Sequence, residues 1–240
     1  MIAKTKCIIG LVCLLVIAPV LAQTSVVGNV THLDGVLSAL RTDGRSKLLG
    51  VKSEVIEGDV LETAARSFAR IKFIDDGEVV LRPNSRFQVS EYKFKNGEGS
   101  SLMRLLKGGL RAVTGYIGET KKENYKVETP VAVIGIRGTN YGALFCSGDC
   151  GDLSNASGQQ LANGLYVDVA QGAVILSNGA GQILVTAGQF GYVRDINTPP
   201  VLLPPEQGVQ VTMPTRISKN NMNGNGLGDA NDEQCTIPTS

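Results

Sequence analysis

The sequence predicts an all-β protein made of many short strands, and two observations support this prediction. Glycine is abundant and tryptophan is absent, with 29 Gly and no Trp in 240 residues. Short runs rich in Val and Ile alternate with turn residues at intervals of roughly 8 to 12 residues, which is typical of sandwiches, barrels and β-solenoids. An internal echo between residues 57–85 and 164–190 favours a β-solenoid-like arrangement, with a sandwich as the alternative.

The elements follow from local patterns, in chain order. Residues 25–35 and 36–44 each end in an Asp-Gly turn signal, and residues 67–94 alternate apolar and polar side chains. Asp75, Asp76 and Gly77 predict a hairpin turn within the alternating stretch. Its apolar members are Phe68, Ile71, Phe73, Val79, Leu81, Phe87 and Val89. Further strands are expected within 108–118, 123–145, 164–178, 181–193 and 208–213, and Ser100–Lys107 is either a helix or a strand.

The N-terminus has the pattern of a cleaved secretory signal peptide. Lys4 and Lys6 precede an apolar run, and small residues end at Ala22, so cleavage leaves Gln23 first. We therefore expect a signal peptide over 1–22, a β domain over 26–194, and a Pro-rich linker with a flexible Asn/Gly-rich tail over 195–240. The mature chain is expected to be periplasmic or secreted, with no integral membrane segment after cleavage.

Charge and cysteine content narrow the range of possible binding partners and sites. The formal net charge is +1 with both signs interspersed, so no nucleic-acid partner is expected. The mature chain keeps Cys146, Cys150 and Cys235, and an oxidising compartment favours a disulfide. Cys146–Cys150 is the preferred bridge, and the alternatives join Cys235 to either of them. A zinc site is disfavoured, because only one cysteine pair is closely spaced and the sole histidine, His32, is distant in sequence.

The stretch TPVAVIGIRGTNYGALFC, residues 129–146, places an arginine inside an apolar run. Pro130 cannot donate to a sheet and belongs at a strand start or edge, while Gly138 permits a bulge or a close backbone approach. Arg137 can donate several hydrogen bonds in a fixed fork, and Thr139 can bond a local peptide group. We therefore predict a polar clasp from Arg137 to the Asp75–Asp76 turn or to Asp59. Recognition of an anionic ligand is the alternative.

Catalytic and metal sites find little support in the sequence. No serine or cysteine motif accompanies His32, and the glycine-rich stretches lack the spacing of a phosphate loop, so no enzyme activity and no cofactor are expected. The tail offers one weak calcium-loop frame with neutral amides at its first positions. Its ligands would be Asn221, Asn223, Asn225, Asp229 and Asp232.

Four segments together resemble the FecR-type periplasmic domain family. They are EGDVLETAARSFARIKFIDDGEVVLRPNSRF, LLKGGLRAV, VETPVAVIGIRGTNYGA, and VAQGAVILSN with VTAGQFGYV. The third carries the specific part, in which Thr129 and Pro130 precede Arg137, Gly138 and Thr139. The resemblance spans about residues 26 to 193 and implies a sensor domain that contacts another protein of the cell envelope.

The chain departs from the classical sensors in one respect. It shows neither their cytoplasmic segment nor their membrane span, so the sigma-factor step does not carry over. The sequence therefore predicts an exported β-rich interaction module that binds an envelope protein through a sheet edge or an exposed face. The alternatives are a small-ligand or glycan-binding envelope protein and a structural component of a surface assembly. No sequence feature specifies an oligomeric state.

Overall fold

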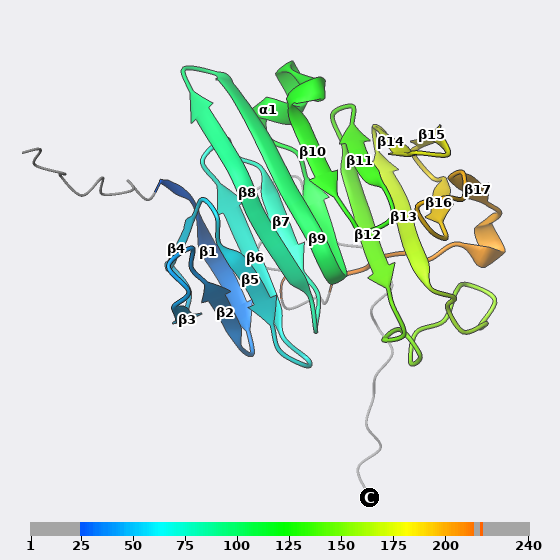
Figure 1. Cartoon of the computed structure of the whole chain (residues 1–240), viewed down its shortest axis with the longest axis horizontal. Coiled ribbons are helices and arrows are strands. Elements are labelled where there is room, and N and C mark those ends of the chain that lie inside the picture. The colour runs from blue at the N-terminus through cyan, green and yellow to red at the C-terminus, as the bar shows by residue number, and fades with distance from the viewer. Residues whose placement is uncertain (1–24, 214–216, 218–240) are drawn as a thin grey trace, which may run out of the picture.

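The protein is all-β, as predicted. The computed structural model describes residues 25–213 and Ile217, and its strands form one connected, open and mixed 17-stranded sheet. The predicted signal peptide over 1–22, the calcium frame and Cys235 lie outside the described residues. Figure 1 shows the chain advancing along its long axis, from the blue strands at one end to the yellow and orange strands at the other.

The strands pair into two layers that share one long strand. Layer A follows the order β4 (Glu54–Ile56), β1 (Val26–Asp34), β6 (Phe68–Phe73), β7 (Glu78–Leu81), β9 (Glu98–Val113), β12 (Asn140–Cys146), β13 (Gly164–Gln171), β16 (Phe190–Val193) and β17 (Val201–Leu203). Layer B follows the order β3 (Ser46–Leu49), β2 (Leu37–Leu40), β5 (Val60–Thr63), β8 (Arg86–Lys95), β9, β10 (Tyr125–Glu128), β11 (Val133–Ile136), β14 (Ala173–Asn178) and β15 (Gly181–Thr186). The first part of β9 pairs with β8 and β10, and its last part pairs with β7 and β12.

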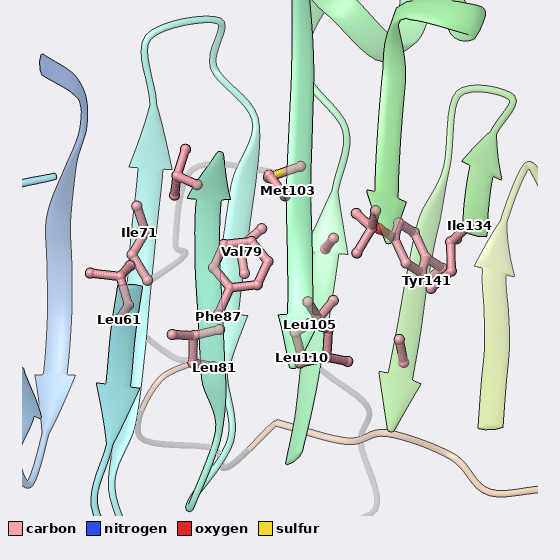
Figure 2. Close-up of a cluster of buried hydrophobic side chains, with 14 of the residues drawn as sticks. Leu61, Ile71, Val79, Leu81, Phe87, Met103, Leu105, Leu110, Ile134 and Tyr141 are labelled. Atoms are coloured by element: carbon pink, nitrogen blue, oxygen red, sulfur yellow. The ribbon is translucent and has the colours of Figure 1, made fainter. Parts of the chain in front are cut away.

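The hydrophobic core lies between the two layers. One continuous cluster joins buried side chains from both layers, as Figure 2 shows for part of it: Leu61, Phe87, Met103, Leu105 and Ile134 from layer B, and Ile71, Val79, Leu81, Leu110 and Tyr141 from layer A. Because the chain passes repeatedly from one layer to the other while it advances, the fold combines solenoid-like winding with sandwich-like packing.

Ser100–Lys107, for which the sequence left helix and strand open, is a strand and part of β9. Two other predicted segments differ in the structure. Residues 108–118 remain a strand only to Val113, and α1 (Tyr116–Thr120) follows because Asp75 accepts hydrogen bonds from the first turn of that helix. Residues 208–213 are not a strand, although Val211 is fully buried. Two short 3₁₀ helices, η1 (Lys122–Asn124) and η2 (Pro205–Gln207), complete the described elements.

The predicted hairpin turn joins β6 to β7, and its first aspartate is buried. The Asp75 carboxylate accepts hydrogen bonds from Gly77 N at 3.0 Å, Ile117 N at 3.2 Å and the Tyr92 hydroxyl at 2.5 Å. Asp76 is exposed and adopts a positive φ of 66°, a conformation that aspartate tolerates in turns. Asp75 therefore ties the turn, β8 and the start of α1 together.

Residues 208–213 with Ile217 form a strap across the outer face of layer A. Five cross-strand neighbours make a row beneath the strap, at right angles to the strands: Arg70, Val80, Arg111, Gly142 and Asp168. The orange trace in Figure 1 runs back beneath the sheet along this course. The strap therefore returns the chain from β17 towards the strands that precede it.

Buried polar contacts hold the strap in place. Arg111 Nη1 donates to Asp168 Oδ2 and to Val211 O, each at 3.0 Å, and Val211 N donates to Asp168 Oδ1 at 2.9 Å. A Cβ at Gly142 would lie 2.5 Å from Val211 Cβ, so the missing side chain makes room for Val211. Arg82 donates to Thr212 O, and Arg70 to Ile217 O.

Candidate functional site

Strand β11, which lies between the Thr-Pro turn and the Arg-Gly-Thr segment, has two distinct faces. Ala132, Ile134 and Ile136 are buried in the core, whereas Val131 and Val133 are half-buried and point outward. Gly135 and Arg137 continue the outward row, and Arg137 is exposed. Arg137 therefore lies outside the core, on the solvent face of layer B.

The predicted clasp is wrong. Among the described residues, the Arg137 guanidinium has no hydrogen-bond or ion-pair partner. The carboxylates expected to hold it have other partners, since Asp59 accepts from Arg41 Nη1 at 2.7 Å and Asp75 is bound as described above. Arg137 continues the outward phase of β11, so its side chain points away from both carboxylates.

The structural role of the Arg-Gly-Thr segment belongs instead to Thr139. Its buried hydroxyl donates to Ala173 O at 2.8 Å and accepts from Arg137 N at 3.1 Å, and its N–H donates to Thr114 Oγ1 at 3.0 Å. Gly138 adopts a φ of 63°, which favours glycine. The segment thus fixes the backbone between β11 and β12 and holds Arg137 outward.

The Thr-Pro segment forms a tight turn between β10 and β11. Thr129 Oγ1 donates to Ala132 O at 2.8 Å and accepts from Ala132 N at 3.0 Å, while Thr129 N also donates to Ala132 O. Pro130 sits exposed in this turn, just ahead of β11, where its missing N–H costs no sheet hydrogen bond.

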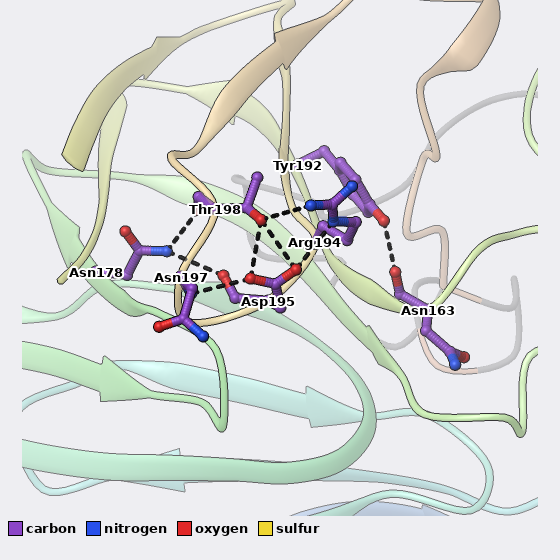
Figure 3. Close-up of polar contacts among 7 residues, drawn as sticks. All are labelled: Asn163, Asn178, Tyr192, Arg194, Asp195, Asn197 and Thr198. Carbon is purple, nitrogen blue, oxygen red and sulfur yellow. Dashed lines mark hydrogen bonds and ion pairs between the residues drawn. The ribbon is translucent and has the colours of Figure 1, made fainter. Parts of the chain in front are cut away.

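A shallow pocket of about 340 Å³ opens beside this turn. It is lined by Thr129, Pro130, residues 131–133, residues 177–179 and Ile196. Ile196 is 58% exposed, and a polar network places the loop that carries it. Figure 3 shows this network: Asn178 Nδ2 donates to Asp195 O at 3.1 Å and to Thr198 O at 2.8 Å, and Thr198 Oγ1 donates to the Asp195 carboxylate.

Together these residues define a surface that we call the β11 face. Its apolar members are Pro130, Val131, Val133, Ile175 and Ile196. Gly135 pairs with Lys126 on one side and with Ile175 on the other, so the surface is flat between them. Lys126 and Arg137 are exposed cations at its margin, whereas Glu128 is already paired with Arg104 at 2.7 Å. The β11 face is therefore apolar at its centre and positively charged at one side.

Sequence reasoning missed Ile175, Asn178 and Ile196. A signal for Ile175 was present, because Ala173–Leu176 is apolar at every position rather than at every second one, so one apolar side chain had to face outward. Asn178 and Ile196 reach the site only through the fold, which brings the β14–β15 turn and the loop after β16 beside Thr129.

The predicted disulfide is present. Cys146 and Cys150 are bonded, with their Cα atoms 5.5 Å apart. Among residues 25–213 and Ile217, no group of His, Cys, Asp and Glu side chains is arranged to hold a metal ion. The described part of the chain also has no helix that is long and apolar enough to cross a membrane.

Comparison with known proteins agrees with the resemblance seen in the sequence. Residues 59–175 match the family model described as FecR protein. The matched region includes β9 to β11 and the Arg-Gly-Thr segment. No curated protein matches the chain.

Solved structures show distant similarity. Two crystal structures of a "putative anti-sigma factor" from Parabacteroides distasonis ATCC 8503 are each 12% identical to the chain, with TM-scores of 0.44 and 0.45, and cover 62% of it. The chain spans 60% of the length of those proteins. A structure described as a cell surface anchoring domain is 24% identical, with a TM-score of 0.25, over 26% of this chain and 82% of that one.

Proposed function

We propose that the chain is an exported FecR-type interaction module that binds another protein of the cell envelope through the β11 face. The observation that supports the proposal most strongly is the outward row of β11, where Val131 and Val133 occupy positions that a solvent-facing strand normally gives to polar residues. Apolar centres edged by arginine are typical of protein interfaces.

The surface also indicates the kind of partner. Val133, Ile175 and Ile196 favour apolar side chains of the partner, and the pocket beside Pro130 has room for one of them. Arg137 and Lys126 favour an acidic group at the margin, because complementary charge speeds encounter and fixes orientation. We therefore infer a partner segment that is apolar with an acidic residue near one end.

Export is supported by the leader pattern of residues 1–22 and by the Cys146–Cys150 disulfide, which is typical of oxidising compartments. Fractionation of cells that express the full chain tests this part. We expect the protein in the periplasmic or extracellular fraction, with Gln23 as its first residue. A full-length protein in the cytoplasmic fraction would contradict export.

The binding proposal is tested with matched variants. The mature chain, Gln23 to Ser240, is used to capture proteins from its own envelope extract, beside Val133→Asp and Arg137→Glu. The control is Val36→Asp, which makes the same chemical change at a half-exposed valine near the other end of the molecule. Circular dichroism and melting temperature check that every variant is folded.

The outcomes separate clearly. The proposal predicts one defined envelope protein that is retained by the wild type and by Val36→Asp, and lost by folded Val133→Asp, with weaker retention by Arg137→Glu. Equal retention by Val133→Asp would show that the β11 face is not the binding surface. Retention of nothing by a folded wild type would exclude the partner and direct the search to small ligands.

A further inference from the structure

The two layers end in four edge strands, and three of these edges are protected. β3 is short and carries Lys47, and β4 is shorter still and carries Glu54. β17 has three residues between Pro199–Pro200 and Pro204–Pro205. Short length, charge and proline are the features that keep sheet edges from pairing with other chains.

The fourth edge, β15, has none of these features. Its six residues, GQILVT, contain neither a charge nor a proline. Its side chains alternate, with Ile183 and Val185 directed inward and Gln182, Leu184 and Thr186 directed outward. Leu184 is 49% exposed. β15 is therefore the one edge of the described chain that is left open to pairing.

The register shows which backbone groups of β15 are free. Arg137 N donates to Ala173 O, so Ala173 and every second residue of β14 bond to β11, and the intervening residues bond to β15. The backbone groups of Gln182, Leu184 and Thr186 consequently face away from β14. Thr186 N donates to Gln189 Oε1 at 2.9 Å and Thr186 O accepts from Gln189 N at 2.9 Å, but no described residue bonds to the backbone of Gln182 or Leu184.

We propose that β15 pairs with β15 of a second copy of this chain, antiparallel and about a two-fold axis at Leu184. This register places Leu184 opposite Leu184, Ile183 opposite Val185, and Gln182 opposite Thr186, so apolar meets apolar and polar meets polar. The two Leu184 residues exchange N–H to C=O bonds, which carry the pairing. Gln182 N–H of each copy adds a second hydrogen bond to Thr186 C=O of the other, which also keeps its bond from Gln189 N.

The pairing joins layer B of the two copies into one sheet. It also extends the apolar row from Ile175 and Leu184 into the second copy, because Ile175 lies opposite Leu184 in the β14–β15 register. Uncharged side chains make self-pairing free of repulsion, and an isologous contact closes at the dimer. The inference goes beyond the proposed function and uses Leu184, which is not part of the β11 face.

Cysteine crosslinking tests the register. All variants are made in the mature chain with Cys235→Ser, which removes the thiol outside the disulfide. Residues directly opposite each other in a hydrogen-bonded antiparallel pair have Cα atoms about 5.5 Å apart, within disulfide range. Oxidised Leu184→Cys should therefore form a covalent dimer. Gln182→Cys alone and Thr186→Cys alone should stay monomeric, but a mixture of the two should crosslink.

The opposite results would overturn the proposal. If folded Leu184→Cys remains monomeric on oxidation, or if Gln182→Cys crosslinks to itself, β15 does not pair about Leu184. In light scattering over a concentration series, the proposal predicts a wild-type mass that rises to twice the monomer value and a folded Leu184→Lys that stays monomeric, because like charges would then face each other. Partner binding by the β11 face is measured separately, by comparing capture with wild type and Val133→Asp. A negative result for dimerisation through β15 therefore does not affect the proposal for the β11 face, and the reverse also holds.

Discussion

The two adjacent aspartates of the β6–β7 turn have opposite environments. Asp75 accepts three hydrogen bonds in the interior, whereas exposed Asp76 pairs with Lys72 at 2.8 Å. Burying donors without an acceptor costs about 1–3 kcal/mol for each group. Asp75→Ala should therefore lower the free energy of unfolding by about 3 kcal/mol or more, as measured by denaturant titration.

The neighbouring position supplies the control. Asp76→Asn keeps a residue type that tolerates positive φ and removes only an exposed ion pair, so it should change stability by less than about 1 kcal/mol. Equal effects of the two substitutions would mean that the Asp75 contacts do not stabilise the fold.

His32, the sole histidine, gives the molecule a predicted acid sensitivity. Partial burial lowers the pKa of His32 below its ordinary value of 6.5, and the positive charge of Arg70, its cross-strand neighbour, lowers the pKa further. The unfolded chain therefore binds this proton more tightly than the folded chain does. The free energy of unfolding therefore keeps its full value above pH 6.5, where His32 is neutral in both states. It decreases as the pH falls from 6.5 through the lower pKa of the folded state, because the unfolded chain takes up the proton first.

Proton NMR and thermal melting test this prediction for His32. The single imidazole gives one pair of titrating proton NMR signals, from Hε1 and Hδ2, whose shared midpoint should lie below 6.5 in the folded protein. His32→Gln should remove part of the acid-induced loss of melting temperature. A midpoint at or above 6.5 would contradict the assigned environment.

At the scale of elements, the contact between the strap and layer A depends on a buried ion pair. The side chains of Arg111 and Asp168 are 7% and 6% exposed. Removing one partner of a buried pair typically costs about 3–5 kcal/mol, because the other charge stays buried without compensation. We expect this loss of unfolding free energy for Asp168→Ala in denaturant titration.

The exposed pair of Arg104 and Glu128 provides a matched comparison within the same protein. Its side chains are 42% and 37% exposed, so Glu128→Ala should cost less than about 1 kcal/mol. A similar cost for Asp168→Ala would show that the strap contributes little to stability.

The elements also show what the sequence could and could not predict. The turn at Asp75–Gly77 and the apolar members of residues 67–94 were predictable, because turn chemistry and alternation are local. The direction of Arg137 was not, since β11 is apolar on both faces and alternation alone does not say which face is inward. The strap could not be predicted for another reason: its hydrogen bond between Arg111 and Val211 joins residues that are 100 positions apart in the sequence.

At the scale of the whole molecule, the 100 positions between Arg111 and Val211 in the sequence predict an order of folding. Contacts between residues far apart in the chain pay a large loop-closure entropy, so the strap should dock after the two layers have formed. Removing the two methyl groups of buried Val211 should cost about 2 kcal/mol. If the strap is absent from the transition state, Val211→Ala should speed unfolding by about 30-fold and leave the refolding rate unchanged.

Stopped-flow measurements over a range of denaturant check this order. Ile71→Val, a conservative change within the β6–β7 hairpin, serves as the comparison and should slow refolding if the hairpin forms early. Slower refolding of Val211→Ala would instead place the strap in the folding nucleus.

The course of the strap has a mechanical consequence. Because Ile217 lies beside Arg70 on β6, and β6 pairs with β1, the first and last described residues of the chain are held at the same end of the long axis. A load applied between Ser25 and Ile217 would peel β1 and the strap from layer A before it reached the core. We expect β10 to β15, which carry the β11 face, to stay folded under such tension, so that a tethered molecule keeps the surface proposed for partner binding while its ends are pulled.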